Sequence, residues 1–422
     1  MRVELAYGRS QLAVELPDKR TTIIQPSHTP GLKDERGAVV AALEKPIGAC
    51  PLREWIGPGE RICILFTDIT RATPNDRIIP WLLDYLGDVP AENITLLNQL
   101  GTHRPNTRAE LEQLLTPAVV RKYRVLNHEP EDPAALAQVG TTSDGTPALL
   151  NRHFLEAGAR IVTGFIEPHF FAGFSGGPKG IMPGIAGLQT VMSNHGAKNI
   201  GHPCSAFGVT DGNPIWEEMR DIALRAGPSF LLNVALNEQR QITGVFAGDL
   251  IAAHKAGCEF VRNSAMQKFD APFDIVVTTN SGYPLDQNLY QGVKGMSAGA
   301  RVIKPGGTIF LACECREGVP PDCWLDRILR SASSPEEILA LLATPGFQRP
   351  EQWQAQTQAL IQRKARVLLY SSLPDDIVRA AHLTPCHDIS AAVKDLLSSN
   401  GARVAALPQG PLTIPYLAQE RV

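Results

Sequence analysis

Three histidines lie where the surrounding residues favour chemistry over packing. His103 lies in the segment Gly-Thr-His-Arg directly after an apolar stretch, and His169 follows a proline in a second turn-rich segment. Imidazole titrates near neutral pH, so two histidines on converging loops favour acid–base catalysis. His195 ends a predicted helical run, where a neutral imidazole can coordinate a metal.

Cations and hydrogen-bond donors suited to a small carboxylate come from two other segments. Arg71 ends the segment Asp-Ile-Thr-Arg that begins at Asp68, and Lys294 ends Tyr-Gln-Gly-Val-Lys, which begins at Tyr290. Guanidinium and ammonium groups bind carboxylates through charge-assisted hydrogen bonds. Each residue singly also fits a solvated surface position, so the predicted carboxylate site depends on their combination.

A glycine-rich segment suggests close approach of the backbone to a ligand. Residues 158–212 hold 12 of the 36 glycines, and residues 173–180 end in Pro178-Lys179-Gly180. A Walker loop needs glycine immediately before its lysine and Ser or Thr after it, which this segment lacks. It could still bind a phosphate through backbone N–H groups, before a helix predicted at 186–194.

The elements that must position these residues alternate between strand and helix. Strands are predicted at 61–67, 93–97 and 160–164, with helices at 33–44 and from about 77 and 107, after an N-terminal hairpin. This alternation indicates a mostly parallel sheet with helices on both faces. Ligands of such sheets gather beyond the carboxyl ends of the strands, and three of these strands end in polar, turn-rich loops.

A second series of the same kind begins near residue 271. Its predicted strands are 274–282, 307–315, 365–372 and 404–407, with helices from about 289, 335 and 388. We therefore predict an α/β fold of two domains, each a mostly parallel sheet with helices on both faces, and an active site in the cleft between them. The expected boundaries are 1–270 and 271–404, with a tail, 405–422, that packs back on the first domain.

Composition narrows the class of protein. Forty basic and 43 acidic residues give a net charge of −3, so nucleic acid is not an expected partner. No apolar window is long enough to span a bilayer, and no signal sequence is evident at the N-terminus, so no membrane association is expected. The eight dispersed cysteines do not form a disulfide framework, and a cytoplasmic protein is predicted.

Taken together, six ordered segments resemble the lactate racemase family. They are DITRATP at 68–74, GTHR at 101–104, EPHFFAGFSGGPKGIMPG at 167–184, SNH at 193–195, YQGVK at 290–294 and QWQ at 352–354. Members of that family carry a nickel-pincer nucleotide, a pyridinium mononucleotide whose two sulfur-bearing arms and one ring carbon bind Ni(II). A histidine completes the near-planar site, a geometry that suits nickel.

The resemblance implies a role for each matching residue. Pro178 departs from the family pattern, where a basic residue more often precedes the lysine. The implied roles are cofactor tether for Lys179; nickel ligand for His195; acid–base catalysis for His103 and His169; cofactor binding for Asp68, Ser175, Gly176 and Gly177; and substrate binding for Arg71, Tyr290, Gln291, Lys294 and Trp353.

The implied reaction is inversion of C2 of a 2-hydroxy acid, such as lactate. The Cα–H of such a substrate is not acidic, so removal of hydride while a base takes the hydroxyl proton is the easier route. The cofactor carries the hydride, and one histidine serves each enantiomer. Other proteins make the cofactor, so enzymes of cofactor biosynthesis are expected partners besides the small carboxylate.

Three alternatives remain open from the sequence. The first is an epimerase of the same family that acts on a larger 2-hydroxy acid. The second is a zinc-dependent hydrolase that uses His103, His169 and His195 as ligands, although it leaves Lys179 and Lys294 without roles. The third is a non-catalytic cofactor-binding protein of the same fold, which would need no second base.

Overall fold

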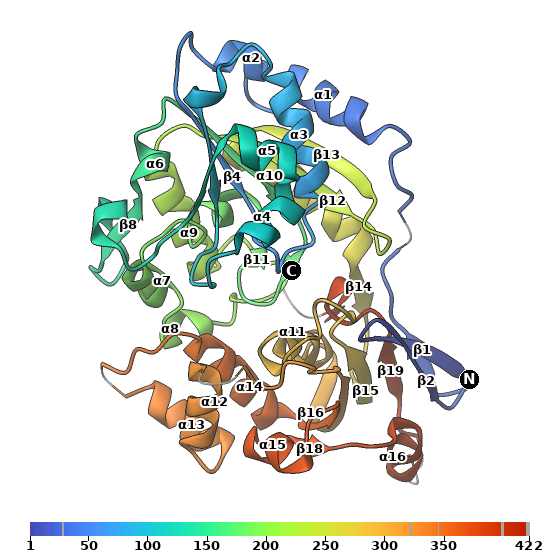
Figure 1. The fold of residues 1–422 in the computed structure, drawn as a ribbon. Coiled ribbons are helices and arrows are strands. Elements are labelled where there is room, and N and C mark those ends of the chain that lie inside the picture. Colours follow the sequence, from blue (N-terminus) through green and yellow to red (C-terminus); the bar gives the residue numbers. More distant parts are fainter. Residues whose placement is uncertain (28, 321–322, 345, 398–400, 419–422) are drawn as a thin grey trace. The chain divides into compact units, whose positions relative to one another are not determined.

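A computed structural model describes residues 1–27, 29–320, 323–344, 346–397 and 401–418. The chain divides into two compact units (Figure 1). What we call the N-terminal unit comprises His28–His195 and Gly208–Ser264. The C-terminal unit comprises Met1–Ser27, Gly196–Phe207 and Ala265–Val422.

The N-terminal unit is built on a six-stranded sheet of order β13-β12-β9-β4-β5-β6. All neighbours are parallel except β12 and β13, which form an antiparallel pair at one edge. The strands of this sheet are β4 (Ile62–Phe66), β5 (Ile94–Asn98), β6 (Arg124–Asn127), β9 (Ala159–Phe165), β12 (Phe230–Leu236) and β13 (Ile242–Asp249). Two small hairpins pair β7 (Leu136–Thr141) with β8 (Pro147–Asn151) and β10 (Pro168–His169) with β11 (Gly173–Phe174).

Helices of this unit pack on the sheet, because the apolar side chains of α1, α3 and α4 form one buried core with those of the strands. All five residues of β4 are buried, as expected for a strand covered on both faces. Helix α4 begins with a capping box in which Thr107 and Glu110 each accept from the other's backbone N–H. The helices are α1 (Glu35–Glu44), α2 (Leu52–Trp55), α3 (Asn75–Tyr85), α4 (Arg108–Leu115), α5 (Pro117–Lys122), α6 (Arg152–Leu155), α7 (Leu188–Asn194), α9 (Pro214–Arg225) and α10 (Leu250–Ala265).

The C-terminal unit contains a fully parallel six-stranded sheet of order β18-β17-β16-β15-β19-β3. Its strands are β3 (Thr21–Ile23), β15 (Phe273–Thr279), β16 (Ile303–Ala312), β17 (Arg366–Tyr370), β18 (Thr384–Pro385) and β19 (Val404–Leu407). Paired beside it are β1 (Arg2–Tyr7) with β2 (Ser10–Glu15), and β14 (Met266–Phe269) with β20 (Ile414–Leu417). The helices are α8 (Ala197–Ile200), α11 (Leu289–Ala300), α12 (Trp324–Arg330), α13 (Pro335–Leu342), α14 (Gln352–Lys364), α15 (Asp375–Ala380) and α16 (Ile389–Leu396).

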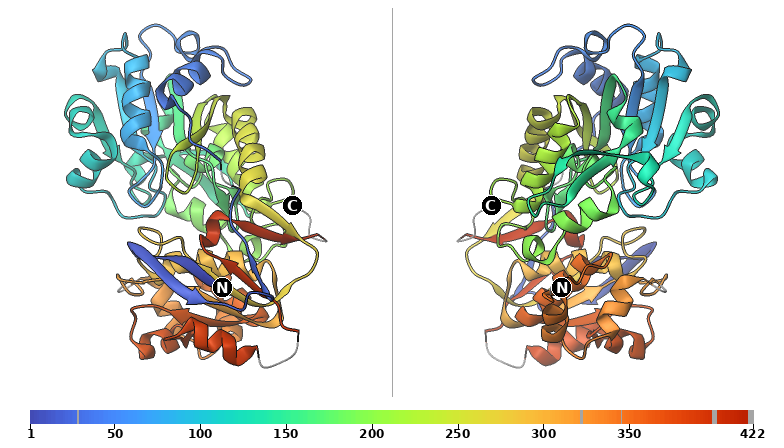
Figure 2. Two further views of the ribbon diagram at one scale, coloured as in Figure 1. Left: turned by 90° about the vertical axis from the view of Figure 1, so that its right-hand side faces the viewer. Right: turned by 90° about the vertical axis from the view of Figure 1, so that its left-hand side faces the viewer.

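The two-domain α/β architecture agrees with the prediction, but the ends of the chain are grouped differently. The hairpin β1-β2 belongs to the C-terminal unit and is drawn in dark blue near the N label (Figure 2). Its inward side chains, Val3, Leu5 and Val14, pack into the core of the second sheet. Strand β3 pairs with β19, and β20 pairs with β14 rather than with the N-terminal unit. Residues 1–27 and 405–418 therefore lie with the second sheet, because an interior strand such as β19 needs neighbours on both sides.

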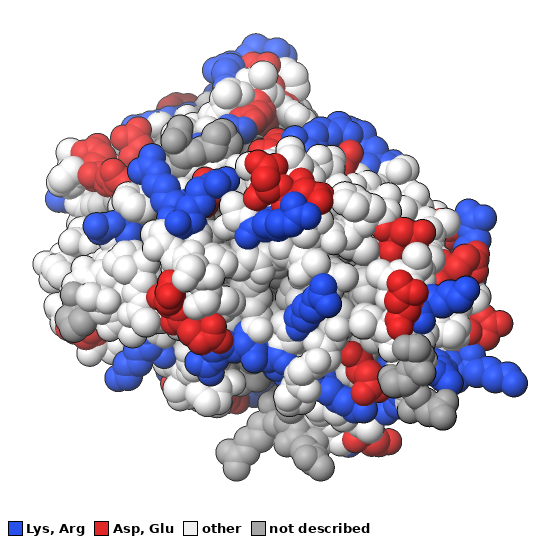
Figure 3. Space-filling view, turned by 90° about the horizontal axis from the view of Figure 1, so that it is seen from below, with Lys and Arg blue, Asp and Glu red and all other residues white. Residues whose placement is uncertain are grey.

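The surface carries charges of both signs. On the face drawn in Figure 3, basic and acidic side chains are interspersed. Within the described ranges, no helix combines the length and the apolar character needed to cross a membrane. All eight cysteines are free thiols.

Candidate active site

Three loops meet at the carboxyl edge of the N-terminal sheet. They follow β4, β5 and β9, which are neighbours in the order β9-β4-β5. Beyond β5, the backbone N–H of Gly101 donates to the carbonyl of Gly184 over 2.9 Å, and the Gln99 amide donates to the carbonyl of Thr163 over 2.7 Å. The predicted convergence of the loops is confirmed within this unit, because parallel neighbours share one carboxyl edge.

A buried carboxylate orients the first histidine. Asp68 is only 2% exposed, and its Oδ2 lies 2.7 Å from Nδ1 of His103. Thr70 donates its backbone N–H and its hydroxyl to the other oxygen, Oδ1. Burial opposes ionisation, but the charge and hydrogen bond of His103, with the Arg71 guanidinium and Thr70, hold the pKa of Asp68 well below its usual range. An ionised carboxylate only accepts, so Nδ1 of His103 carries a proton and Nε2 of the neutral ring is a base.

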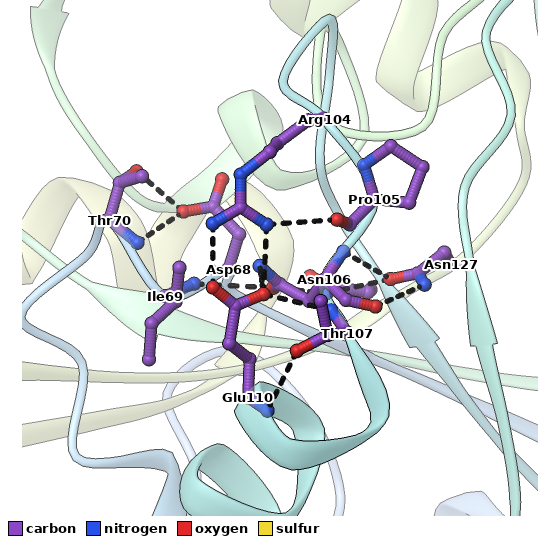
Figure 4. Close-up of polar contacts among 10 residues, drawn as sticks. Asp68, Ile69, Thr70, Arg104, Pro105, Asn106, Thr107, Glu110 and Asn127 are labelled. Atoms are coloured by element: carbon purple, nitrogen blue, oxygen red, sulfur yellow. Dashed lines mark hydrogen bonds and ion pairs between the residues drawn. The ribbon is translucent and has the colours of Figure 1, made fainter.

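The loop that carries His103 is held by a polar network (Figure 4). Arg104 forms two hydrogen bonds with Glu110, at 2.6 and 2.8 Å. The Asn127 amide donates to the backbone carbonyl of Asn106, and the Asn106 side chain accepts from Ile69 in the loop after β4. These bonds tie the loops after β4 and β5 together, so that Asp68 and His103 are held in register.

Arg71 lies on the same loop as Asp68. Its backbone N–H donates to the carbonyl of Asp68 in a tight turn, and its positive charge contributes to the low pKa of that carboxyl. Among the described residues, the Arg71 guanidinium has no hydrogen-bond partner. A half-buried cation beside the Asp68–His103 pair suits an anionic ligand.

The second histidine has a different environment. His169 is 7% exposed at the end of β10, opposite Gly173 of β11. The backbone N–H of Ala172 donates to its Nδ1 over 3.3 Å, so neutral His169 carries its proton on Nε2. Its ring stacks on Phe170 at 4.9 Å and meets the edge of Phe171 at 4.6 Å. Aromatic packing and the short hairpin fix the orientation of the ring.

His195 lies at the end of α7 and is linked to His169 through one aromatic ring. Phe171 meets His195 edge to face at 5.0 Å. Nδ1 of His195 lies 2.9 Å from Oδ1 of Asn194, whose own amide donates to the carbonyl of Ile215 and to Glu218. Because the amide nitrogen is used as a donor, Oδ1 must accept, and Nδ1 of His195 carries the proton. Nε2 therefore holds the lone pair that a metal ligand needs.

Lys179 and His195 interact electrostatically. Burial, and to a smaller extent the charge of Lys179, lowers the pKa of His195 to about 3. The imidazole is therefore neutral at physiological pH, as ligation requires. Lys179 lies in a 3₁₀ turn, Gly177–Gly180, where its backbone N–H donates to Gly176 and its carbonyl accepts from Gly184.

The glycines before Lys179 are explained by packing within the protein. A Cβ on Gly176 would lie 2.4 Å from Oδ1 of Asn233, and one on Gly177 would lie 2.4 Å from Cγ of His254. The Gly177 N–H donates to Asn233, and the Ser175 hydroxyl bonds to the backbone of residues 165 and 167. These groups already have protein partners, which favours a supporting role for this loop over the expected phosphate cradle.

The remaining predicted residues lie in the C-terminal unit. Tyr290, Gln291 and Lys294 lie on α11, and the indole N–H of Trp353 on α14 donates to the Tyr290 hydroxyl over 3.1 Å. The Gln354 amide donates to the backbone carbonyl of Tyr290. Oε1 of Gln291 is buried and has no hydrogen-bond partner among the described residues, so this acceptor is available to a donor on a ligand.

The three-histidine zinc site is not formed. Within the part of the chain that the structure describes, no group of three or more His, Cys, Asp or Glu side chains could hold a metal ion. The three histidines instead have separate partners, which are the Asp68 carboxylate, the Ala172 N–H and the Asn194 amide.

Three supporting residues were not predicted. Asn194 lies inside the SNH segment, and its position before His195 was the signal available for it. Asn233 is the single polar residue in the otherwise apolar strand FLLNVAL, which could have marked it. His254 lies on α10, a helix that the sequence analysis did not predict, and nothing in its neighbours pointed to the loop it contacts.

Comparison with known proteins shows the family of the chain. The family model of the lactate racemase N-terminal domain matches residues 7–208, and that of the C-terminal domain matches residues 269–414. The chain belongs to the lactate racemase family. Lactate racemases of Thermoanaerobacterium thermosaccharolyticum and Lactiplantibacillus plantarum are 35% and 34% identical to it, each over 97% of this chain and 97% and 98% of their own lengths.

Two solved structures share the fold of this chain. The lactate racemase apoprotein of T. thermosaccharolyticum superposes with a TM-score of 0.92 at 34% identity, covering 98% of this chain and all of that one. A Thermotoga maritima protein, with a TM-score of 0.70 and 22% identity over 90% of this chain and 98% of its own, shares the fold alone. As a member of the lactate racemase family, the chain is an isomerase.

Proposed function

We propose that this member of the lactate racemase family interconverts the enantiomers of a 2-hydroxy acid, with lactate as the first candidate substrate. The observation that carries the proposal is the Asp68–His103 pair with the positive charge of the Arg71 guanidinium beside it. A base and a cation at one edge of the sheet suit a substrate that has a hydroxyl next to a carboxylate. His169 is proposed as the second acid–base group.

The proposed cofactor is a nickel-pincer nucleotide attached to Lys179. The residues fit such a group, because neutral His195 carries its proton on Nδ1 and its lone pair on Nε2, and because Lys179 lies within electrostatic range of its ring. Asn194 would hold the ligand in that tautomer, while Lys179 would supply the attachment. When bound, the cofactor supplies a reversible acceptor for the hydride of C2.

The protein's own side chains would bind the substrate and move its hydroxyl proton. His103 takes that proton at Nε2, while Asp68 stabilises the resulting imidazolium. Arg71 holds the carboxylate of the substrate, so that C2 keeps its position while hydride leaves or returns at either face. Holding a reacting group in place in this way accounts for a large share of catalysis. Gln291, Lys294, Tyr290 and Trp353 are proposed as further substrate contacts.

The proposal includes a cellular setting. The cofactor is made by other proteins, so activity would require the enzymes of its biosynthesis, and we propose a cytoplasmic location. Protein produced alone would then be inactive and unmodified at Lys179.

The test is peptide mass spectrometry on protein produced together with the cofactor-making enzymes. We expect a nickel-bearing adduct on Lys179 and racemisation of lactate, followed by chiral chromatography. Lys179→Ala should lose both, whereas Lys198→Ala, a change at an exposed lysine, should keep both.

Two results would change the proposal. An unmodified Lys179 in active protein whose metal is zinc would overturn the cofactor and the hydride route. An adduct on Lys179 without lactate racemisation would keep the chemistry and direct the search to larger 2-hydroxy acids, tested as a panel with the same chiral readout.

A further inference from the structure

Two buried side chains hold the loop that leads to Lys179, and both lie outside the segments that the sequence analysis singled out. We infer that Asn233 of β12 and His254 of α10 are positioning residues that clamp this loop and hold Lys179 where the cofactor attaches. The inference rests on the proposed function, in which Lys179 is the tether. It adds two residues that neither touch the substrate nor ligate the metal.

Asn233 holds the loop at Gly177. The Gly177 N–H donates to Oδ1 of Asn233 over 2.8 Å, and the Asn233 amide donates to the carbonyl of Leu232 over 3.1 Å. Both atoms of the side chain are therefore used, and Asn233 is fully buried. Gly176, with φ of +75°, approaches Asn233 so closely that a Cβ would lie 2.4 Å from its Oδ1. A backbone this close to Asn233 has little freedom to shift.

His254 holds the same loop from another element. Its Nε2 lies 2.9 Å from the carbonyl of Ser175, which can only accept, so Nε2 carries the proton. Burial lowers the pKa of His254 to about 4 despite that bond, so the ring is neutral at physiological pH. The ring also fills the space beside Gly177, where a Cβ would lie 2.4 Å from Cγ, and stacks with Trp216 at 6.5 Å and 14°.

The clamp acts on Lys179 through a short length of backbone. Lys179 follows Gly177 by two residues, and its N–H donates to the carbonyl of Gly176 over 3.1 Å. On the other side, its carbonyl accepts from Gly184 over 3.2 Å. A shift of the clamped residues would therefore move Lys179, because these two bonds join its backbone to the clamped loop and to the turn that follows. A cofactor that is attached to Lys179 and ligated by His195 needs a constant distance between these two residues.

His128 offers a matched control in the same unit. It is also buried, its Nε2 lies 3.0 Å from a backbone carbonyl, that of Ala186, and burial lowers its pKa to about 4. Its loss should cost stability in the same way as the loss of His254. Its two ring nitrogens bond to the Ala186 carbonyl and to the Asn151 amide rather than to residues 175–177, so its loss should leave Lys179 in position.

The experiment compares His254→Leu, Asn233→Leu and His128→Leu, with His254→Gln as the conservative variant, since glutamine can place an N–H near the Nε2 position. Each protein is produced with the cofactor-making enzymes, and the modified fraction of Lys179 is measured by peptide mass spectrometry beside its melting temperature. We expect His254→Leu and Asn233→Leu to lower the modified fraction roughly fivefold or more. His254→Gln should restore most of it, and His128→Leu should match the wild type.

A second readout needs no cofactor. In apoprotein, competitive acylation with acetic anhydride measures the reactivity of Lys179 against the other lysines. A loosened loop should raise the relative acylation of Lys179 in His254→Leu and Asn233→Leu, but not in His128→Leu.

The outcomes separate the two proposals. An unmodified Lys179 in the wild type overturns the proposed function, and the acylation experiment then decides the clamp alone. Wild-type modification with normal loading of His254→Leu and Asn233→Leu overturns the clamp and keeps the tether. An equal loss in His128→Leu also overturns the clamp, because the effect would then follow from stability in general.

Discussion

The two proposed acid–base histidines are the same residue type in opposite electrostatic settings. His103 donates from Nδ1 to the buried carboxylate of Asp68 at 2.7 Å, whereas His169 accepts at Nδ1 from the Ala172 N–H at 3.3 Å. In the neutral rings, Nε2 is therefore a base in His103 and a donor in His169. The side-chain type allows either role, and the neighbour on Nδ1 decides between them.

This difference bears on the direction of catalysis. His103 is ready to take a hydroxyl proton, and the imidazolium that forms is stabilised by Asp68. His169 is ready to donate from Nε2, and it must lose its Ala172 contact before Nε2 can act as a base. The two enantiomers would then be processed by steps of unequal rate, although kcat/KM must be equal in both directions because enantiomers have equal free energies in water.

The largest expected effect comes from removal of the better-oriented base. His103→Ala should lower kcat/KM from either enantiomer toward the upper end of roughly 10²–10⁴-fold, the range for loss of a general base. The measurement is chiral chromatography of lactate starting from each pure enantiomer. His387→Ala is the control, since His387 pairs with Asp375 on the surface with 78% of its side chain exposed. Comparable activity of His103→Ala and His387→Ala would contradict the role of His103.

Asp68→Asn should remove the difference between the two histidines, because Asp68 fixes the tautomer of His103. An amide can turn its N–H toward Nδ1 of His103, which moves the ring proton to Nε2 and removes the base; we expect a loss of roughly 10²–10³-fold. A change in melting temperature with an unaltered rate per loaded enzyme would show that Asp68 is only structural.

The same pair predicts a pH dependence of stability. The pKa of Asp68 is lower in the folded than in the unfolded protein, whose value is near 3.8. Its contribution is therefore present above that pH and is lost as pH falls through the folded value. Wild type should be more stable than Asp68→Asn at pH 7, and urea unfolding should show the gap closing in strong acid.

A comparison of His169→Gln with His169→Ala tests whether His169 acts mainly as a hydrogen-bond donor. Glutamine keeps an N–H near the Nε2 position but cannot act as a base. If donation is the main task of His169, His169→Gln should retain roughly tenfold more activity than His169→Ala in steady-state assays, the worth of about one hydrogen bond. Equal and complete loss in both variants would show that His169 must act as a base.

The smallest effect concerns a histidine that takes no part in the chemistry. Burial lowers the pKa of His128 to about 4 from 6.5, so the unfolded chain binds the extra proton first as pH falls. The neutral ring thus stabilises the fold above pH 6.5, and this stability is lost between pH 6.5 and 4. When the pH falls from 7 to 5, the free energy of unfolding of the wild type should decrease by about 2 kcal/mol more than that of His128→Leu. Urea unfolding at the two pH values measures this difference. An equal loss would show that His128 is not responsible.

Much of the N-terminal sheet could be predicted from local pattern. Apolar runs identified β4, β5 and β9 to within two residues, and the polar segments after them contain Asp68 and His103. The antiparallel pair β12-β13 was not predicted, nor was α10. Those elements supply Asn233 and His254. The Lys179 loop could therefore be recognised by its glycines, but the residues that support it could not be predicted.

The meaning of those glycines also changed with the structure. Their density predicted a backbone that approaches a ligand, whereas the near contacts of Gly176 and Gly177 are Asn233 and His254. A glycine allows either a positive φ or the close approach of another group to the backbone. Only the folded chain shows which of these applies.

The sequence by itself determined which chemical groups stand at the strand ends, because burial periodicity and turn residues act over a few positions and can be recognised locally. The tertiary structure alone decided which nitrogen of each histidine carries the proton and what grips the Lys179 loop. The deciding partners are distant in the chain: 35 residues separate Asp68 from His103, 56 separate Gly177 from Asn233, and 79 separate Ser175 from His254. Hydrogen bonds over such separations exist only once the sheet has brought its strands together.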